Sequence, residues 1–380
     1  MLGIDRFIQH YSPASSQRLG LLTNHATLAG SGQPVALELL QRGVSIQKLF
    51  SPEHGVFSQA EDGAAQKNQL DQLTGLPVVS LYGETLIPKE EDLLDLDVII
   101  ADLPNIGCRF YTYWWTITHM MEACARHGKT LIIPDRPNWR GADSMIEGPM
   151  LDEKNGSSFL GRWSMPLAFP YTLGQLAKWF TKEKSIALDL KVIPCDNERP
   201  HHFVPPSPAI NEIQTTYSYP CIGLFEGVNI SVGRGTTFPF RVIGAPWIDS
   251  MKLLSFFNDL NLPGVKAHPY SFKPEWSVYE KQFCYGLYLT VTDVKVFKPV
   301  TCAIHLMHFL MKEYAELAPA RYPTAANPSG ENHLDRLLGV LDSFPLVKNQ
   351  VDRLMQLVQN EEVKKWKHQV DHLLKHSPHP

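Results

Sequence analysis

The stretch Leu49-Phe50-Ser51-Pro52-Glu53-His54-Gly55 decides the fold prediction for this chain. The apolar run from Ile46 to Phe50 is typical of a buried parallel strand, and Pro52 prevents the hydrogen-bond ladder of that strand from continuing. Glu53 and His54 are therefore expected just beyond the carboxyl end of a strand, where open α/β sheets bind their ligands. The alternative is an ordinary turn with a solvated glutamate, and these seven residues alone do not decide between the two.

The first half of the chain alternates short apolar runs with helical patterns, which is typical of βαβ units and a mostly parallel sheet. The sequence after the first strand has no G-x-G-x-x-G fingerprint, so the sheet gives no evidence for NAD or FAD. We expect an α/β fold without a cofactor. The expected strands are 18–23, 46–51, 77–82, 97–102 and 129–135, and the expected helices are 34–42 and 112–127, with a further helix beginning at Pro88.

The pattern changes near residues 140–160, where proline, glycine and aromatic residues become more frequent. We therefore predict one domain over residues 1–150, carrying the catalytic edge, and a second α/β (α+β) domain over 151–380 that closes the cleft. In the second domain the patterns predict a long loop at 200–220, a strand at 286–292, and helices at 172–182, 247–260, 300–317 and within 333–375.

Composition and charge exclude several classes of partner. The formal net charge is -4 with no basic stripe, which gives no case for nucleic acid or for an anionic lipid surface. No apolar run approaches the roughly 20 residues that a membrane span requires, and no signal peptide is visible, so we expect a cytoplasmic protein. The six cysteines form no C-x-x-C pair, and neither a metal site nor a disulfide framework is expected. The sequence leaves the oligomeric state open.

Polar residues follow four of the predicted strands. Asn24 follows the first, Glu53 and His54 the second, Asp102 the fourth, and Asp135 the fifth, with Arg136 and Asn138 close behind. Carboxyl ends of parallel strands meet at one edge of a sheet, so these side chains are expected to converge. Strand ends are polar in most α/β folds, however. Convergence alone is therefore as compatible with an ordinary sheet edge as with a binding site.

Two further segments could bind a ligand. Gly107 to Trp115 is the densest aromatic stretch, in which Tyr111 and Tyr113 are candidates to contact sugar faces and Arg109 could hold a carboxylate. Trp114 and Trp115 are expected in the core. Gly233 to Thr237 could cradle an anion, because glycines free backbone N–H groups and Arg234 offers a bidentate fork.

Several motifs together resemble the NamZ-type exo-β-N-acetylmuramidases, a bacterial glycosidase family long catalogued as a domain of unknown function. The resemblance extends over the whole chain and implies a Rossmann-like N-terminal domain packed on a second α/β domain. It also implies a cleft that releases terminal N-acetylmuramic acid from peptidoglycan fragments, without a metal. The motifs, in order, are Ser51–Gly55, Ser80–Gly83, Arg109–Tyr113, Asp135–Asn138, Glu147–Pro149, Glu226–Asn229, Gly233–Phe240, Gly244–Trp247 and Val291–Asp293.

The chain departs from the family pattern at several polar positions. Val56-Phe57-Ser58-Gln59, Pro104-Asn105, Phe169-Pro170 and Val232 stand where the family has polar or glycine-containing sequences. This favours, as an alternative function, a catalytically weakened protein that binds amino sugars or muropeptides. A nucleotide-using enzyme is a second alternative, which only the type of sheet supports.

The resulting hypothesis is a glycosidase with two carboxyl groups, one protonated and one ionised. Glu53 is the predicted acid, and Asp102, Glu226 and Asp135 remain open as its partner. Arg109 or Arg234 is expected to pair with the lactyl carboxylate of the sugar. The predicted substrate-binding residues are His54, Asn24, Arg109, Tyr111, Tyr113, Asp135, Arg136, Asn138, Asn229 and Arg234.

Overall fold

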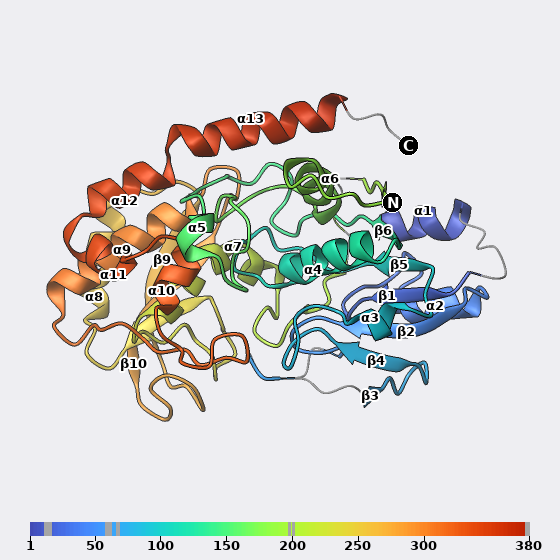
Figure 1. Cartoon of the computed structure of the whole chain (residues 1–380). Coiled ribbons are helices and arrows are strands. Elements are labelled where there is room, and N and C mark those ends of the chain that lie inside the picture. Colours follow the sequence, from blue (N-terminus) through green and yellow to red (C-terminus); the bar gives the residue numbers. More distant parts are fainter. Residues whose placement is uncertain (11–16, 58–62, 66–68, 197–198, 200–201, 377–380) are drawn as a thin grey trace.

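A seven-stranded sheet forms the centre of the N-terminal lobe (Figure 1). The computed structural model describes residues 1–10, 17–57, 63–65, 69–196, 199 and 202–376. The strand order is β3-β4-β2-β1-β5-β6-β7, and all neighbouring pairs are parallel except β3 and β4. The strands are β1 (Leu19–Leu22), β2 (Ile46–Ser51), β3 (Gln69–Leu70), β4 (Pro77–Ser80), β5 (Val98–Ala101), β6 (Thr130–Pro134) and β7 (Leu190–Ile193).

Helices cover both faces of this sheet, as the sequence predicted. Successive side chains of a strand point to opposite faces, so Leu21 and Leu49 pack in one core and Leu22 and Phe50 in the other. The first core includes residues of α1 (Gly3–His10) and α2 (Val35–Gln41). The second includes residues of α3 (Glu90–Leu93), α4 (Tyr113–Arg126) and α6 (Leu173–Glu183).

The expected site residues lie at the carboxyl edge of the sheet. Strands β2, β5 and β6 are parallel members of the sheet and end one or two residues before Glu53, Asp102 and Asp135, respectively. The prediction of one shared edge is therefore confirmed. The sheet also extends past residue 150, because β7 pairs with β6 and adds the last strand to the N-terminal lobe.

The C-terminal lobe contains a three-stranded antiparallel sheet of order β8-β10-β9. Helix α13 runs back across the N-terminal lobe (Figure 1), where Tyr171 donates a hydrogen bond of 2.7 Å to Asp371. The remaining elements are α5 (Glu153–Gly156), α7 (Ile213–Ile222), η1 (Gly223–Gly227, a 3₁₀ helix), β8 (Val242–Ala245), α8 (Ser250–Asp259), β9 (Val265–Phe272), β10 (Cys284–Val291), α9 (Pro299–Glu313), α10 (His333–Leu338), α11 (Ser343–Asn349), α12 (Val351–Val358) and α13 (Glu361–His376).

The loop predicted over residues 200–220 is wrong in its last part, where helix α7 begins at Ile213 and includes Pro220. Residues 200 and 201 lie outside the described residues. Thr215, Thr216 and other residues of α7 are buried, and tertiary packing of this kind overrides the low helix propensity of proline. Within the described ranges, no helix combines the length and apolar character needed to cross a membrane.

The contact between η1 and α10 leads to a testable prediction. A Cβ atom at Gly227 would lie 2.6 Å from the Cβ and 2.7 Å from the Cα of Leu334. Gly227→Ala should therefore lower the free energy of unfolding by about 1–3 kcal/mol through overpacking. Gly156→Ala is the matched control, because the nearest atom would be 3.5 Å away and the change should stay within about 0.5 kcal/mol. Equal denaturation midpoints for the two variants would show that α10 is free to move away from η1.

Candidate active site

A pocket with about 780 Å³ of empty space, counted out to its opening, lies beside Glu53. We call it the Glu53 pocket. Both lobes contribute to its wall. Of the residues predicted from sequence, it brings together Glu53, His54, Tyr111, Glu226 and Arg234. Its other polar or aromatic lining residues are Tyr82, Phe110, Thr112, Ser158, Phe159, Ser207, Tyr219, Phe240, Tyr322, Thr324, Asn327, His333 and Arg336.

Glu53 is held in a tight turn after β2. His54 has φ of 69° and Gly55 has φ of 78°, and the Gly55 amide donates a 3.1 Å bond to the Pro52 carbonyl. The Glu53 carboxylate accepts bonds from the Gly63 amide at 2.9 Å and from the Thr112 hydroxyl at 2.7 Å. Thr112 precedes helix α4, so contacts from two separate segments fix the orientation of this largely buried carboxylate.

Glu226 is the second carboxylate of the pocket, and it comes from the C-terminal lobe. It lies in η1 and accepts a 2.6 Å bond from Nε of Arg234. The Arg234 guanidinium also lies 4.9 Å from the ring centroid of Phe240, a cation–π contact. Glu53 and Glu226 are the only carboxylates among the described residues that line this pocket.

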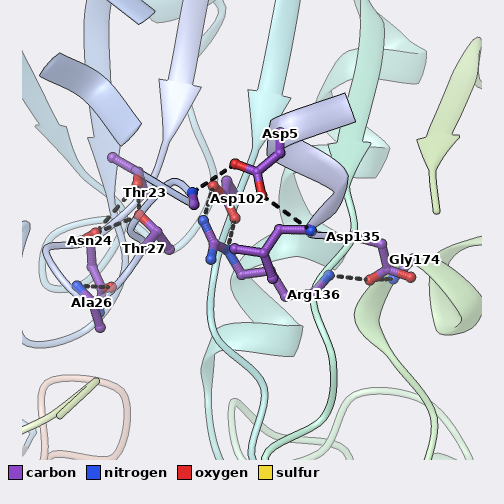
Figure 2. A network of polar contacts seen from close by, with 11 residues as sticks. Asp5, Thr23, Asn24, Ala26, Thr27, Asp102, Asp135, Arg136 and Gly174 are labelled. Atoms are coloured by element: carbon purple, nitrogen blue, oxygen red, sulfur yellow. Dashed lines mark hydrogen bonds and ion pairs between the residues drawn. The ribbon is translucent and has the colours of Figure 1, made fainter. Parts of the chain in front are cut away.

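Asp102 and Asp135 lie at the same sheet edge (Figure 2), but neither lines the Glu53 pocket. The guanidinium of Arg136 binds both oxygens of Asp102, with a distance of 2.7 Å from Nη2 to Oδ2. Asp135 accepts bonds from Thr172 and from the Gly174 amide at 3.0 Å. Burial raises the pKa of Asp135 to about 6, although these bonds oppose the shift. Both carboxylates therefore serve as internal links at the edge of the sheet.

Four of the residues predicted to bind the ligand form hydrogen bonds with other groups of the protein. The Asn24 amide donates to the Tyr113 hydroxyl and to the Pro206 carbonyl, both at 3.0 Å. The Asn138 amide donates to the Phe169 and Tyr171 carbonyls, and Asn229 bonds the backbone of Glu316 and Ala318. Asn24, Tyr113, Asn138 and Asn229 are therefore placed outside the pocket lining.

Arg109 is also placed differently from its expected role. Its side chain is fully buried and donates to the carbonyls of Pro149 at 2.8 Å, Met165 at 3.0 Å and Leu337 at 3.1 Å. Burial lowers the pKa of Arg109 to about 10, so the guanidinium still carries its charge at neutral pH. Arg109 connects α10 to the N-terminal lobe and does not line the pocket.

The departures from the family pattern that the structure describes do not line the Glu53 pocket. Asn105 bonds the Tyr171 carbonyl and the Gly107 amide, while Phe169 and Val232 lie in the core. Ser58 and Gln59 lie outside the described residues. The described positions therefore give no support to a weakened pocket.

Sequence reasoning missed the contribution of residues 322–337. Tyr322, Thr324, Asn327, His333 and Arg336 reach the pocket because the Ala325 amide bonds the Gly63 carbonyl at 2.8 Å, next to the segment that binds Glu53. This contact joins positions more than 250 residues apart, and no local pattern indicates it. Within the described ranges, no group of three or more His, Cys, Asp or Glu side chains could hold a metal ion.

The fold and the pocket define a two-lobed α/β protein with two carboxylates in one pocket. The family models of exo-β-N-acetylmuramidase NamZ match the chain, the N-terminal model over residues 19–214 and the C-terminal model over 217–374. The chain therefore belongs to the exo-β-N-acetylmuramidase NamZ family of glycoside hydrolases. The two models meet near residue 215, well beyond the boundary expected near residue 150.

One curated relative and two solved structures are similar to the chain. The peptidoglycan β-N-acetylmuramidase NamZ of Bacillus subtilis (strain 168) is 38% identical over 327 residues, which cover 83% of this chain and 78% of that protein. A DUF1343 family protein of Bacteroides fragilis NCTC 9343 has a TM-score of 0.86 at 26% identity and covers 98% of this chain and 97% of that one. A second protein of that family and organism has a TM-score of 0.71 at 24% identity, with 98% of each chain covered.

The Asp102–Arg136 pair gives a prediction that separates a structural from a chemical role. Asp102→Asn should lower the free energy of unfolding by about 3–5 kcal/mol, because it leaves the Arg136 charge buried without its partner. The kcat of the folded variant should be unchanged. Asp97→Asn, in an exposed pair with Arg18, is the control and should cost no more than about 1 kcal/mol. Loss of kcat without loss of stability would instead place Asp102 in the chemistry.

Proposed function

We propose that this chain hydrolyses the glycosidic bond of a terminal N-acetylmuramic acid in peptidoglycan fragments. Glu53 serves as the general acid, and Glu226 is the second carboxylate. The observation that carries this assignment is that Glu53 and Glu226 line one pocket from opposite lobes, while Asp102 and Asp135 are bonded elsewhere. Membership of the NamZ family supports the substrate class.

The environments of the two carboxyl groups suit different roles. The Thr112 hydroxyl can either donate to or accept from Glu53, so this contact persists whether or not the carboxyl carries its proton. Glu226 faces the Arg234 guanidinium, and an adjacent cation stabilises negative charge on a carboxylate. A glycosidase needs one proton donor for the leaving oxygen and one ionised group to activate water or attack carbon. We assign these two roles to Glu53 and Glu226, respectively.

The aromatic side chains of the pocket support a sugar ligand. Tyr111, Tyr219 and Phe240 line the wall, and the ring of Tyr219 packs edge-on against Phe240 at 4.7 Å between centroids. Rings with polar tips suit sugars, which present an apolar face together with hydroxyl groups at their edge. The pocket therefore offers both stacking surfaces and hydrogen-bonding groups around the two carboxylates.

Glu53→Gln should lower kcat on a chromogenic N-acetylmuramide by roughly 10²–10⁴-fold while leaving substrate affinity and fold largely intact. The amide keeps the size and hydrogen-bonding reach of the carboxyl group but cannot release a proton to the leaving oxygen. Glu122→Gln is the matched control, because Glu122 pairs with Arg162 and does not line the pocket. If the Glu53→Gln enzyme had the kcat of the unmodified protein, Glu53 would not be the general acid.

Glu226→Gln should also lower kcat, by at least about 10²-fold, because the amide can neither attack carbon nor activate water. NMR of the reaction of the unmodified enzyme identifies the anomer that forms first, and this anomer assigns the role of Glu226. Retention of configuration indicates a nucleophile, and inversion indicates a base. If Glu226→Gln turned over normally, the second carboxylate would have to come from outside the described lining of the pocket.

A further inference from the structure

Two of the described arginines line the Glu53 pocket, and they differ in their bonding partners. Arg234 donates through Nε to Glu226, within the pair assigned to the chemistry. The other is Arg336, on helix α10 of the C-terminal lobe. We infer that Arg336 binds the carboxylate of the terminal sugar and thereby selects an acidic amino sugar over a neutral one. This inference rests on the proposed function and names its specificity-determining residue.

The acidic groups nearest to Arg336 in sequence are bonded to other partners. Glu331 pairs with Arg321 at 2.9 Å, and Asp335 accepts the amides of Ser343 at 2.8 Å and Asp342 at 3.1 Å. Toward the residues that the structure describes, Arg336 donates only through Nε, to the Glu331 carbonyl at 3.4 Å, which is a long bond. Within the described part of the chain its guanidinium forms no ion pair, so its outer nitrogens can receive an anion.

Helix α10 is fixed from both lobes, which holds Arg336 at a defined place in the wall. On the C-terminal side, Leu334 packs against Gly227, the residue after Glu226. On the N-terminal side, Arg109 donates to the carbonyl of Leu337, the residue after Arg336. A positioned guanidinium loses less freedom when it binds a planar anion, which is why bidentate arginine pairs are among the stronger polar contacts.

The chemistry of the substrate matches this charge. An N-acetylmuramic acid residue differs from N-acetylglucosamine by a lactyl ether that ends in a carboxylate. Glu53 and Glu226 repel such a group, Arg109 is buried behind the wall, and Arg234 is bonded to Glu226. Among the described residues, Arg336 is therefore the cation of the pocket wall that can receive the lactyl group. A neutral amino sugar gains nothing from this contact.

The test compares binding of N-acetylmuramic acid and N-acetylglucosamine by calorimetry, which needs no turnover. Arg336→Gln should weaken binding of N-acetylmuramic acid by about 10–100-fold, the range for a hydrogen bond to a charged group, and should leave N-acetylglucosamine binding unchanged. Arg336→Lys keeps the charge without the planar fork and should recover part of the affinity. Arg42→Gln is the control, because this exposed arginine pairs with Glu38 outside the pocket, and the variant should bind both sugars normally.

Kinetics supply a second readout on chromogenic muramides. Arg336→Gln should raise KM with little change in kcat, because the lactyl group is remote from the bond that breaks. Unchanged affinity for N-acetylmuramic acid, or an equal loss for both sugars, would overturn the inference. The proposed function fails on a different result, namely no turnover of any muramide by the unmodified protein, whatever its binding preference.

Discussion

The arrangement of the two lobes around the pocket depends on the hydrogen bonds that the buried guanidinium of Arg109 donates to both of them. Its three bonds reach the carbonyls of Pro149 and Met165 on the N-terminal side and of Leu337, which lies more than 170 residues further along the chain. Burial of a charge is costly, and three charge-assisted bonds offset that cost only when all three are formed. The contact therefore contributes less to net stability than to one specific placement of α10, and α10 contributes residues to the pocket wall.

The pocket does not lie where the topology alone would place it. The strand order reverses between β1 and β5, and open α/β sheets bind ligands outside the strand ends at such a switch point. Here the ends of β1 and β5 carry Asn24 and Asp102, and Figure 2 shows both within a network of internal polar contacts. Arg136 supplies the positive charge that neutralises Asp102. The pocket lies instead beyond β2 and β4, where Glu53 and Tyr82 meet the C-terminal lobe.

The sequence predicts most of the N-terminal fold, because buried parallel strands are short apolar runs with recognisable ends. It also predicts Glu53, His54, Tyr111, Glu226 and Arg234 as pocket residues. It does not separate Glu53 from Asp102, since both follow a strand, and only tertiary contacts give Asp102 an arginine partner. Arg336 has no sequence signal for the same reason: its place follows from packing of α10 against η1 and from the bond to Arg109.

The turn after β2 explains how adjacent residues reach one pocket. In extended backbone, Glu53 and His54 would point to opposite faces of the strand, and one of the two side chains would point into the core and away from the pocket. His54 instead adopts the left-handed region, with φ of 69°, and Gly55 follows with φ of 78°. Such a conformation is strained for a residue with a side chain, and strain of this kind persists where the surroundings fix it. Pro52 ends the ladder, the turn reverses the direction of the backbone, and both the acid and the imidazole line the pocket.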